Sequence, residues 1–362
     1  MKILYLTPWG YDYLPDQLYT GLCKVLGWES VIDFPWKAEY HEPSCKVPYL
    51  PQNPGRHYEL EEVRGLLEQD EFDLVVLTAQ RRGTLEAFDA VSRDCSVPPI
   101  AFVDSNDSPE MKPNLFRRVG GGVYFKREYH WQGTKSLRDM YVQWRQFGSD
   151  RDLFMRTYPL QMSAILESIP PSDSVTRDVD ISFTGYASHR KRIQAVRTLR
   201  NASDIRFEGG VYGDARTRQS KLVLGSIPIL RAKLQGDPYV GEAKYNYKLG
   251  YDEHYRLLRR SKMGLSIRGS GFDTVRYWEI VASKALLISE KPVISIPHNF
   301  EHGKHAIFCR PDMGDLLDLV RTYMRDDSAR EALAEAGYQH LLKYHTCEQR
   351  AIQFLEICRK KL

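Results

Sequence analysis

The sequence predicts an α/β protein with two doubly wound domains that face a cleft. The chain has 362 residues, which at about 150 residues per domain corresponds to about two domains. Short apolar runs alternate with amphipathic segments, as in parallel sheets that helices cover on both faces. The alternation stops in an irregular stretch that contains "PPSDS" (residues 170–174) and then starts again. We therefore predict one domain over residues 1–165, a second over residues 178–345, and a C-terminal helix over residues 346–362.

The first domain is predicted from its strands. Residues 2–6 form a buried strand, and a helix follows that ends at Gly27. Residues 72–78 and 98–104 are near-continuous apolar runs, which are typical of strands covered on both faces. The segment "TLEAFDAVSR" between them has helical periodicity, and "GGVYFK" predicts a further strand.

The second domain repeats this alternation. Strands are predicted over residues 179–185, 204–209, 262–267 and 285–289, and helices over residues 187–200, 251–261, 315–324 and 329–345. Ligands of doubly wound sheets bind beyond the carboxyl ends of the strands. We therefore expect the functional residues in the turns that follow these strands.

Composition sets broad limits on function. The net charge of +4 is too small to require a nucleic-acid partner, although it allows an anionic ligand. Six scattered cysteines without a C-x-x-C pair indicate a reducing compartment and no zinc site of that spacing. No apolar run approaches the roughly 18 residues of a membrane span, and the N-terminal run is too short for a signal peptide. We expect a cytoplasmic protein without a transmembrane segment.

The stretch "RGSGFDTVRYWEIVASKALLIS" carries the strongest chemical signal. Arg268, Gly269 and Gly271 lie in the turn after a predicted strand, and Arg276 and Glu279 lie in the helix that follows. Glycine amides, a helix N-terminus and guanidinium groups together favour an anion site. The alternative is an ordinary ion pair between residues three apart on a helix surface. The helix is otherwise mostly apolar, which predicts that it is largely buried and that its charges need a reason.

A second basic turn follows the first strand of this domain. Gly185 ends the strand, and the helix after it begins with Arg190 and Lys191. In an anion site the glycine would admit a phosphate group and one of the basic side chains would bind it. A solvated basic helix end is the alternative interpretation.

From Met263 to Arg350 the sequence resembles the C-terminal half of GT-B glycosyltransferases, and it is most similar to the spore-maturation-type branch. The matching features are the R-x-x-E helix, "ASKALLIS", "NFEHGKHAIFC", "AREALAEAG" and "HTCEQR". The strand "VDISFTG" resembles the opening of that half. The resemblance implies two Rossmann-like domains, with the last helix packed on the first.

The resemblance also implies roles for these residues. Glu279 would bind the ribose hydroxyls of a nucleotide-sugar, and Arg268 and Arg276 would face its diphosphate and neutralise the leaving group. The donor is a substrate, so no cofactor or metal is expected. Gly271 stands where related retaining enzymes carry a second glutamate, so the E-x7-E pattern is incomplete.

The catalytic base is expected in the first domain. Inverting GT-B enzymes often have G-H-x-x-P after the first strand, and here Asp12 stands three residues before Pro15, in place of the histidine. An aspartate at that position could deprotonate an acceptor hydroxyl, although it could instead serve as a turn or helix-cap residue. Asp104, and Asp107 after it, compete for the role.

The sequence thus predicts a glycosyltransferase that moves a sugar from a nucleoside diphosphate to an acceptor hydroxyl. The acceptor is a glycan, a small molecule or a nucleic acid. Two alternatives stay open: a nucleotide-sugar 2-epimerase on the same scaffold, and a non-catalytic module that binds a nucleotide or nucleic acid.

Overall fold

A computed structural model describes residues 1–7, 10–45, 47–78, 82–130, 137–169, 175–213, 245–246 and 248–362. The predicted linker at residues 170–174 lies outside this set. The chain divides into two compact units. The first unit comprises Met1–Ile169, Pro292–Asn299 and Gln339–Leu362, and the second comprises Pro170–Lys291 and Phe300–Tyr338.

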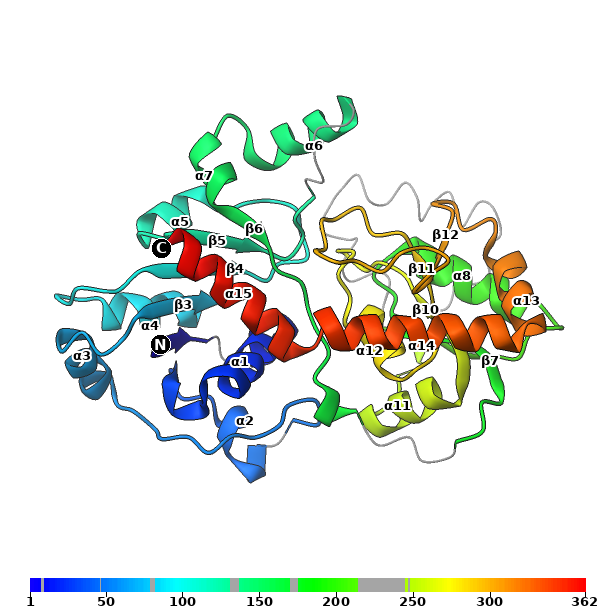
Figure 1. Ribbon diagram of the computed structural model, residues 1–362, viewed down its shortest axis with the longest axis horizontal. Coiled ribbons are helices and arrows are strands. Elements are labelled where there is room, and N and C mark those ends of the chain that lie inside the picture. Colours follow the sequence, from blue (N-terminus) through cyan, green and yellow to red (C-terminus); the bar gives the residue numbers. More distant parts are fainter. Residues whose placement is uncertain are drawn as a thin grey trace. The chain divides into compact units, whose positions relative to one another are not determined.

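The first unit contains a parallel six-stranded sheet of order β2-β1-β3-β4-β5-β6 (Figure 1). Its strands are β1 (Ile3–Leu6), β2 (Val31–Phe34), β3 (Leu74–Thr78), β4 (Ile100–Asp104), β5 (Val123–Lys126) and β6 (Thr157–Pro159). Every residue of β1, β3, β4 and β5 is buried, as expected for strands covered on both faces. The apolar runs in the sequence therefore correspond to the central strands.

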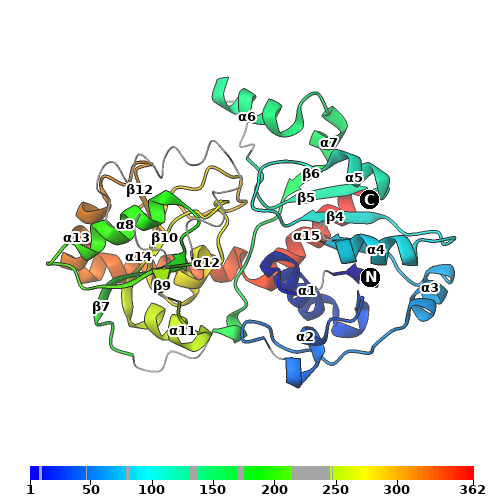
Figure 2. The ribbon, with the colours of Figure 1, turned by 180° about the vertical axis from the view of Figure 1, so that it is seen from behind.

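Helices cover this sheet, and the last helix of the chain is one of them. The helices are α1 (Tyr13–Leu26), α2 (Ala38–His41), α3 (Leu60–Glu68), α4 (Arg82–Val91), α5 (Pro113–Arg118), α6 (Leu137–Phe147), α7 (Arg151–Arg156) and α15 (Cys347–Lys361), with short 3-10 turns at Trp28–Ser30, Pro43–Cys45 and Leu166–Ser168. Helix α15 lies beside α1 in both views (Figure 1, Figure 2). The Phe354 ring of α15 lies 4.6 Å from the Phe125 ring of β5.

The second unit contains a six-stranded sheet of order β12-β11-β10-β7-β8-β9. Its strands are β7 (Val179–Tyr186), β8 (Phe207–Gly213), β9 (Tyr245–Asn246), β10 (Ser261–Ser266), β11 (Leu286–Glu290) and β12 (Ile307–Cys309), and only the β8–β9 pair is antiparallel. The described helices are α8 (Arg190–Arg200), α11 (Tyr251–Arg260), α12 (Val275–Ala282), α13 (Leu316–Arg325) and α14 (Asp327–Tyr344). The strand order reverses between β7 and β10, which makes their carboxyl ends the expected ligand position.

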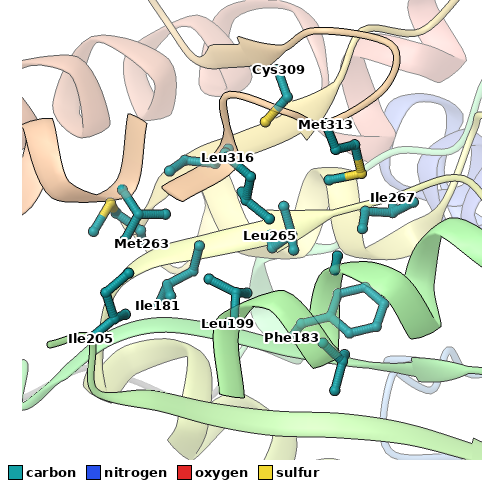
Figure 3. Packing of buried hydrophobic residues seen from close by; sticks show 14 of the residues in the cluster. Ile181, Phe183, Leu199, Ile205, Met263, Leu265, Ile267, Cys309, Met313 and Leu316 are labelled. Atoms are coloured by element: carbon teal, nitrogen blue, oxygen red, sulfur yellow. The ribbon is translucent and has the colours of Figure 1, made fainter. Parts of the chain in front are cut away.

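The core of the second unit fixes the elements that carry the candidate site. Buried side chains from β7, α8 and β10 pack together with residues of β12 and α13 (Figure 3). On the other side of β10, a Cβ atom at Gly264 would lie 2.6 Å from a side-chain carbon of Ile280. A side chain at residue 264 would therefore push α12 away, so this glycine sets the depth of α12 against the sheet.

None of the helices in the described part of the chain has the length and hydropathy needed to cross a membrane.

Candidate functional site

Arg192 holds together the two turns at the reversal point of the second sheet. It is 6% exposed and donates to the carbonyl oxygens of Tyr186 (2.9 Å), Ile267 (2.9 Å) and Arg268 (3.0 Å). Burial and the nearby charge of Arg276 lower the pKa of Arg192 to about 9, so it is still cationic at neutral pH. One buried cation thus connects the end of β7 to the turn after β10.

Arg276 lies against the end of β7. Its guanidinium carbon is 5.0 Å from the centre of the Phe183 ring. A Cβ atom at Gly185 would lie 3.2 Å from Nη2 of Arg276 and 3.4 Å from Nη1 of Arg192. Gly185 therefore leaves the room that the two guanidinium groups occupy. The structure brings together Gly185 and Arg276, which are 91 positions apart in the sequence.

The turn after β10 adds a further cation. The Arg268 guanidinium lies 4.4 Å from the centre of the Phe272 ring and donates to the Ser270 carbonyl oxygen. Gly269 donates its backbone N–H to the Gly271 carbonyl oxygen at 3.0 Å, which closes the turn. Gly271 thus contributes its backbone carbonyl oxygen to the hydrogen bond that closes the turn.

Helix α8 begins at the same end of the sheet. The Nδ1 atom of His189 accepts from the backbone N–H of Lys191 at 3.2 Å and caps the helix. Arg190 is exposed, whereas Lys191 forms an ion pair with Glu290, a buried residue at the end of β11. Of the two basic residues predicted at this helix start, Lys191 therefore already has an anionic partner.

These basic residues make the carboxyl end of the sheet electropositive. We call Arg190, Lys191, Arg192, Arg268 and Arg276 the cation cluster. Burial, followed by the charges of Arg268, Lys191, Arg192 and Arg190, lowers the pKa of His189 to about 4. Burial is the larger cause of this low pKa, and the four neighbouring cations add to it because the local potential is positive. Such a potential, together with the start of a helix, favours an anionic ligand.

Glu279 is the carboxylate of this region. Its side chain is 14% exposed, and it accepts hydrogen bonds from Nε2 of His254 (3.0 Å) and from the hydroxyl of Tyr255 (3.1 Å). Burial acts to raise the pKa of Glu279, but the charge and hydrogen bond of His254 and the charge of Arg276 outweigh it, so this pKa lies below its usual value. A carboxylate in this setting is a hydrogen-bond acceptor.

The predicted base candidates lie in the first unit, at the carboxyl ends of its strands. Asp12 is half-buried, and its Oδ2 atom accepts from the Ser105 hydroxyl at 2.7 Å. Asp104 is fully buried, and its Oδ2 atom accepts from Lys126 Nζ (2.9 Å) and the Tyr124 hydroxyl (2.5 Å). Ser105, the residue after Asp104 in the chain, thus connects Asp12 to the end of β4. Asp12 is partly open to solvent, whereas Asp104 is not; Asp107, the third candidate, is also partly exposed.

Sequence reasoning missed four residues of these sites: Arg192, His254, Tyr255 and Glu290. Arg192 stood in the basic run at the start of α8, but nothing in the run distinguishes the buried residue from its exposed neighbours. His254 lies 25 positions before the carboxylate it contacts. Its only sequence signal was a His-Tyr pair in the helix that precedes β10.

Metal binding was not expected from the sequence. The described residues contain no group of three or more His, Cys, Asp or Glu side chains with the arrangement of a metal site.

Comparison with known proteins places this geometry in context. Residues 193–356 match a family model described as glycosyl transferase-like. These residues include α12 with Arg276 and Glu279, and α11 with His254. Among curated protein sequences, none matches the chain.

Solved structures share the fold at low sequence identity. HepE from Anabaena, in complex with UDP and glucose, is 12% identical with a TM-score of 0.58, covering 99% of this chain and 100% of that one. A glycosyltransferase from Rickettsia africae is 10% identical with a TM-score of 0.60, covering 99% and 98%. An α-glucosyltransferase in complex with UDP and a 13-mer DNA is 9% identical with a TM-score of 0.56, covering 99% of each chain. The chain therefore has the GT-B glycosyltransferase fold, and its residues 193–356 resemble a glycosyl transferase-like family.

Proposed function

We propose that the protein transfers a sugar from a nucleoside diphosphate to an acceptor hydroxyl, and that the second unit binds the donor. The observation that carries this proposal is the cation cluster at the carboxyl ends of β7 and β10, with Glu279 one helical turn after Arg276. A diphosphate needs cationic donors, and a ribose needs an acceptor for two neighbouring hydroxyls. Both requirements are met within one α/β unit.

The cations have a role in the chemical step as well as in binding. When the bond between the sugar and the diphosphate breaks, the electron pair leaves with the diphosphate and its negative charge grows. Arg268 and Arg276 are fixed by the turn after β10 and by α12, so they would stabilise that charge without reorganising. This role requires no metal, and we propose that transfer is metal-independent.

Asp12 is proposed as the base. An acceptor hydroxyl would give its proton to the Asp12 carboxylate while its oxygen forms the new bond to the sugar carbon. The hydrogen bond from the Ser105 hydroxyl holds the Oδ2 atom of Asp12 in place, and the side chain is only half-buried. Asp104 is better suited to support this turn, because it is fully buried against Lys126.

We also propose a nucleotide, a class of acceptor and a cellular compartment for the reaction. UDP is the first nucleotide to test, because the Anabaena and α-glucosyltransferase structures contain it. The acceptor is a glycan, a small molecule or a nucleic acid; the DNA in one similar structure keeps the last class open. The motifs around the R-x-x-E helix favour the spore-maturation-type branch. All six cysteines are free, which suits a cytoplasmic enzyme.

A thermal-shift screen with UDP, ADP, GDP and their sugars tests the donor site, because a ligand that binds only the native state raises its stability. We expect stabilisation by at least one nucleoside diphosphate. The effect should be lost in Arg276→Ala, weakened in Glu279→Ala and kept in Arg256→Ala, a matched control for an exposed arginine. An unchanged ligand response in the first two variants would show that the site is elsewhere.

Product analysis separates the proposed reaction from its alternatives. With the stabilising nucleotide-sugar and a panel of acceptors, transfer releases free nucleoside diphosphate and places the sugar on an acceptor. An epimerase would change the configuration of the donor sugar and leave added acceptors unmodified. A binding module would hold the nucleotide tightly without releasing product.

A further inference from the structure

We propose that His254 is a positioning residue, which with Tyr255 holds the Glu279 carboxylate in the orientation that binds the donor ribose. This inference rests on the proposed function of the second unit. It assigns to α11 a role in selecting the nucleotide. Neither the R-x-x-E motif nor its neighbours in the sequence indicate that α11 contributes to the site.

The first step of the argument is the geometry of the carboxylate. His254 Nε2 lies 3.0 Å from Oε2 of Glu279, and the Tyr255 hydroxyl donates to Oε1 at 3.1 Å. Each carboxylate oxygen therefore receives one hydrogen bond, and both donors come from one helix. A carboxylate held at both oxygens cannot rotate about its terminal bond without losing a hydrogen bond.

The second step is that His254 is itself fixed. Its Nδ1 atom lies 2.9 Å from Oγ1 of Thr184, a buried residue in β7 next to Gly185. When Nε2 carries a proton it donates to Glu279, whether or not Nδ1 is also protonated. The chain Thr184–His254–Glu279 thus ties the orientation of the carboxylate to the strand whose end carries the anion site.

The third step is the number of hydrogen-bond acceptor positions that remain on the Glu279 carboxylate. An ionised carboxylate has about four acceptor positions, two on each oxygen. The hydrogen bonds from His254 and Tyr255 use one position on each oxygen and leave one on each. Two neighbouring hydroxyls of a ribose require one acceptor each, which matches this remainder. The side chains of His254 and Glu279 are 16% and 14% exposed, so competition from water is limited.

A structural ion pair would show the same contacts, and a ligand-discrimination experiment separates the two roles. The affinities for UDP and for 2′,3′-dideoxy-UDP are measured by calorimetry for the wild type and each variant. The ratio of the two affinities reports only on the ribose hydroxyls. A general loss of order in the unit would weaken both ligands alike and leave the ratio unchanged.

The wild type should prefer UDP over the dideoxy analogue by on the order of tenfold to a hundredfold, as for hydrogen bonds to a charged group. Glu279→Ala should abolish the preference. His254→Ala should reduce it by at least about fivefold, and His254→Gln, which keeps a donor, should restore part of it. Arg256→Ala, an exposed change in the same helix, should leave it intact.

The outcomes distinguish this inference from the proposed function. If Glu279→Ala loses the preference and His254→Ala keeps it, the positioning role is wrong and the donor site stands. If the screen selects ADP or GDP, that nucleotide and its dideoxy analogue replace the UDP pair. If the wild type binds the nucleotide no better than its dideoxy analogue, or binds none of the three nucleotides, the ribose assignment of Glu279 fails and the positioning role fails with it. Thr184→Val provides a second variant if His254→Ala does not fold. It removes the hydroxyl that fixes the ring, and an unchanged ratio in it would overturn the proposal.

Discussion

The replacement of Arg192 by methionine tests whether one buried cation organises the donor site. The guanidinium donates to three carbonyl oxygens, those of Tyr186, Ile267 and Arg268. Methionine keeps much of the apolar stem but leaves these oxygens without the donor. At about 1–1.5 kcal/mol for the hydrogen bond lost at each of the three oxygens, the sum is about 3–4.5 kcal/mol. Relief of the repulsion between Arg192 and Arg276 offsets part of it, so we expect a net loss of about 3 kcal/mol.

Calorimetry and hydrogen exchange measure this loss. A destabilisation of about 3 kcal/mol corresponds to a fall in Tm of roughly 6–12 °C for a unit of this size. Amides of the segment from Ser261 to Arg268 should exchange faster. The control is Arg197→Met at an exposed position of the same helix, which should change stability by less than about 0.5 kcal/mol. If Arg192→Met unfolds like that control and keeps its response to UDP, the carbonyls do not depend on Arg192 and the reasoning is refuted.

Four further predictions concern the two sites. Gly185→Ala should weaken UDP binding by about tenfold with a stability change under about 1 kcal/mol, because the new Cβ displaces the Arg276 guanidinium by a few tenths of an ångström; wild-type affinity would show that Arg276 does not bind the ligand from its present position. The pKa of His189, about 4, lies below its usual value, so the unfolded state binds the proton first and stability should fall as the pH drops from about 6.5 to about 4. Bound UDP should raise that pKa in an NMR titration, and a pKa that does not move would place the phosphates elsewhere. Asp12→Asn should lower kcat by about 10²–10⁴-fold and leave donor affinity unchanged. If Asp104→Asn lowers kcat more than Asp12→Asn does and leaves stability unchanged, Asp104 is the base instead. Transfer should persist in EDTA, and full loss that Mg²⁺ restores would contradict the metal-independent reaction.

The long apolar strands were predictable because burial on both faces leaves a run of apolar residues. Residues 2–6, 72–78 and 98–104 contain β1, β3 and β4, and residues 121–126 contain β5. No comparable run of apolar residues marks β2 (Val31–Phe34), β6 (Thr157–Pro159) or β12 (Ile307–Cys309), which are edge strands of three or four residues. The cleft between the two predicted domains stays a prediction.

The candidate site was predictable where its residues lie close together in the sequence. The turn with Arg268 and the helix with Arg276 and Glu279 form one continuous stretch. Because ligands of doubly wound sheets bind beyond the carboxyl ends of the strands, this stretch was predicted to lie at the binding site. The bonds of Arg192 to carbonyls about 75 positions away were beyond such reasoning. So was the contact of His254 with Glu279, because helical periodicity gives the buried face of α11 but not its partner.

The place of α15 in the first unit has a consequence for how the protein is made. Residues up to Tyr338 suffice for every described element of the second unit except the end of α14, whereas the first unit includes Gln339–Leu362. The first unit can therefore complete its packing only when residues 339–362 are present, because α15 lies against α1. A fragment that stops at Ile169 should accordingly expose apolar surface and aggregate, and adding residues 339–362 as a separate peptide should improve its solubility.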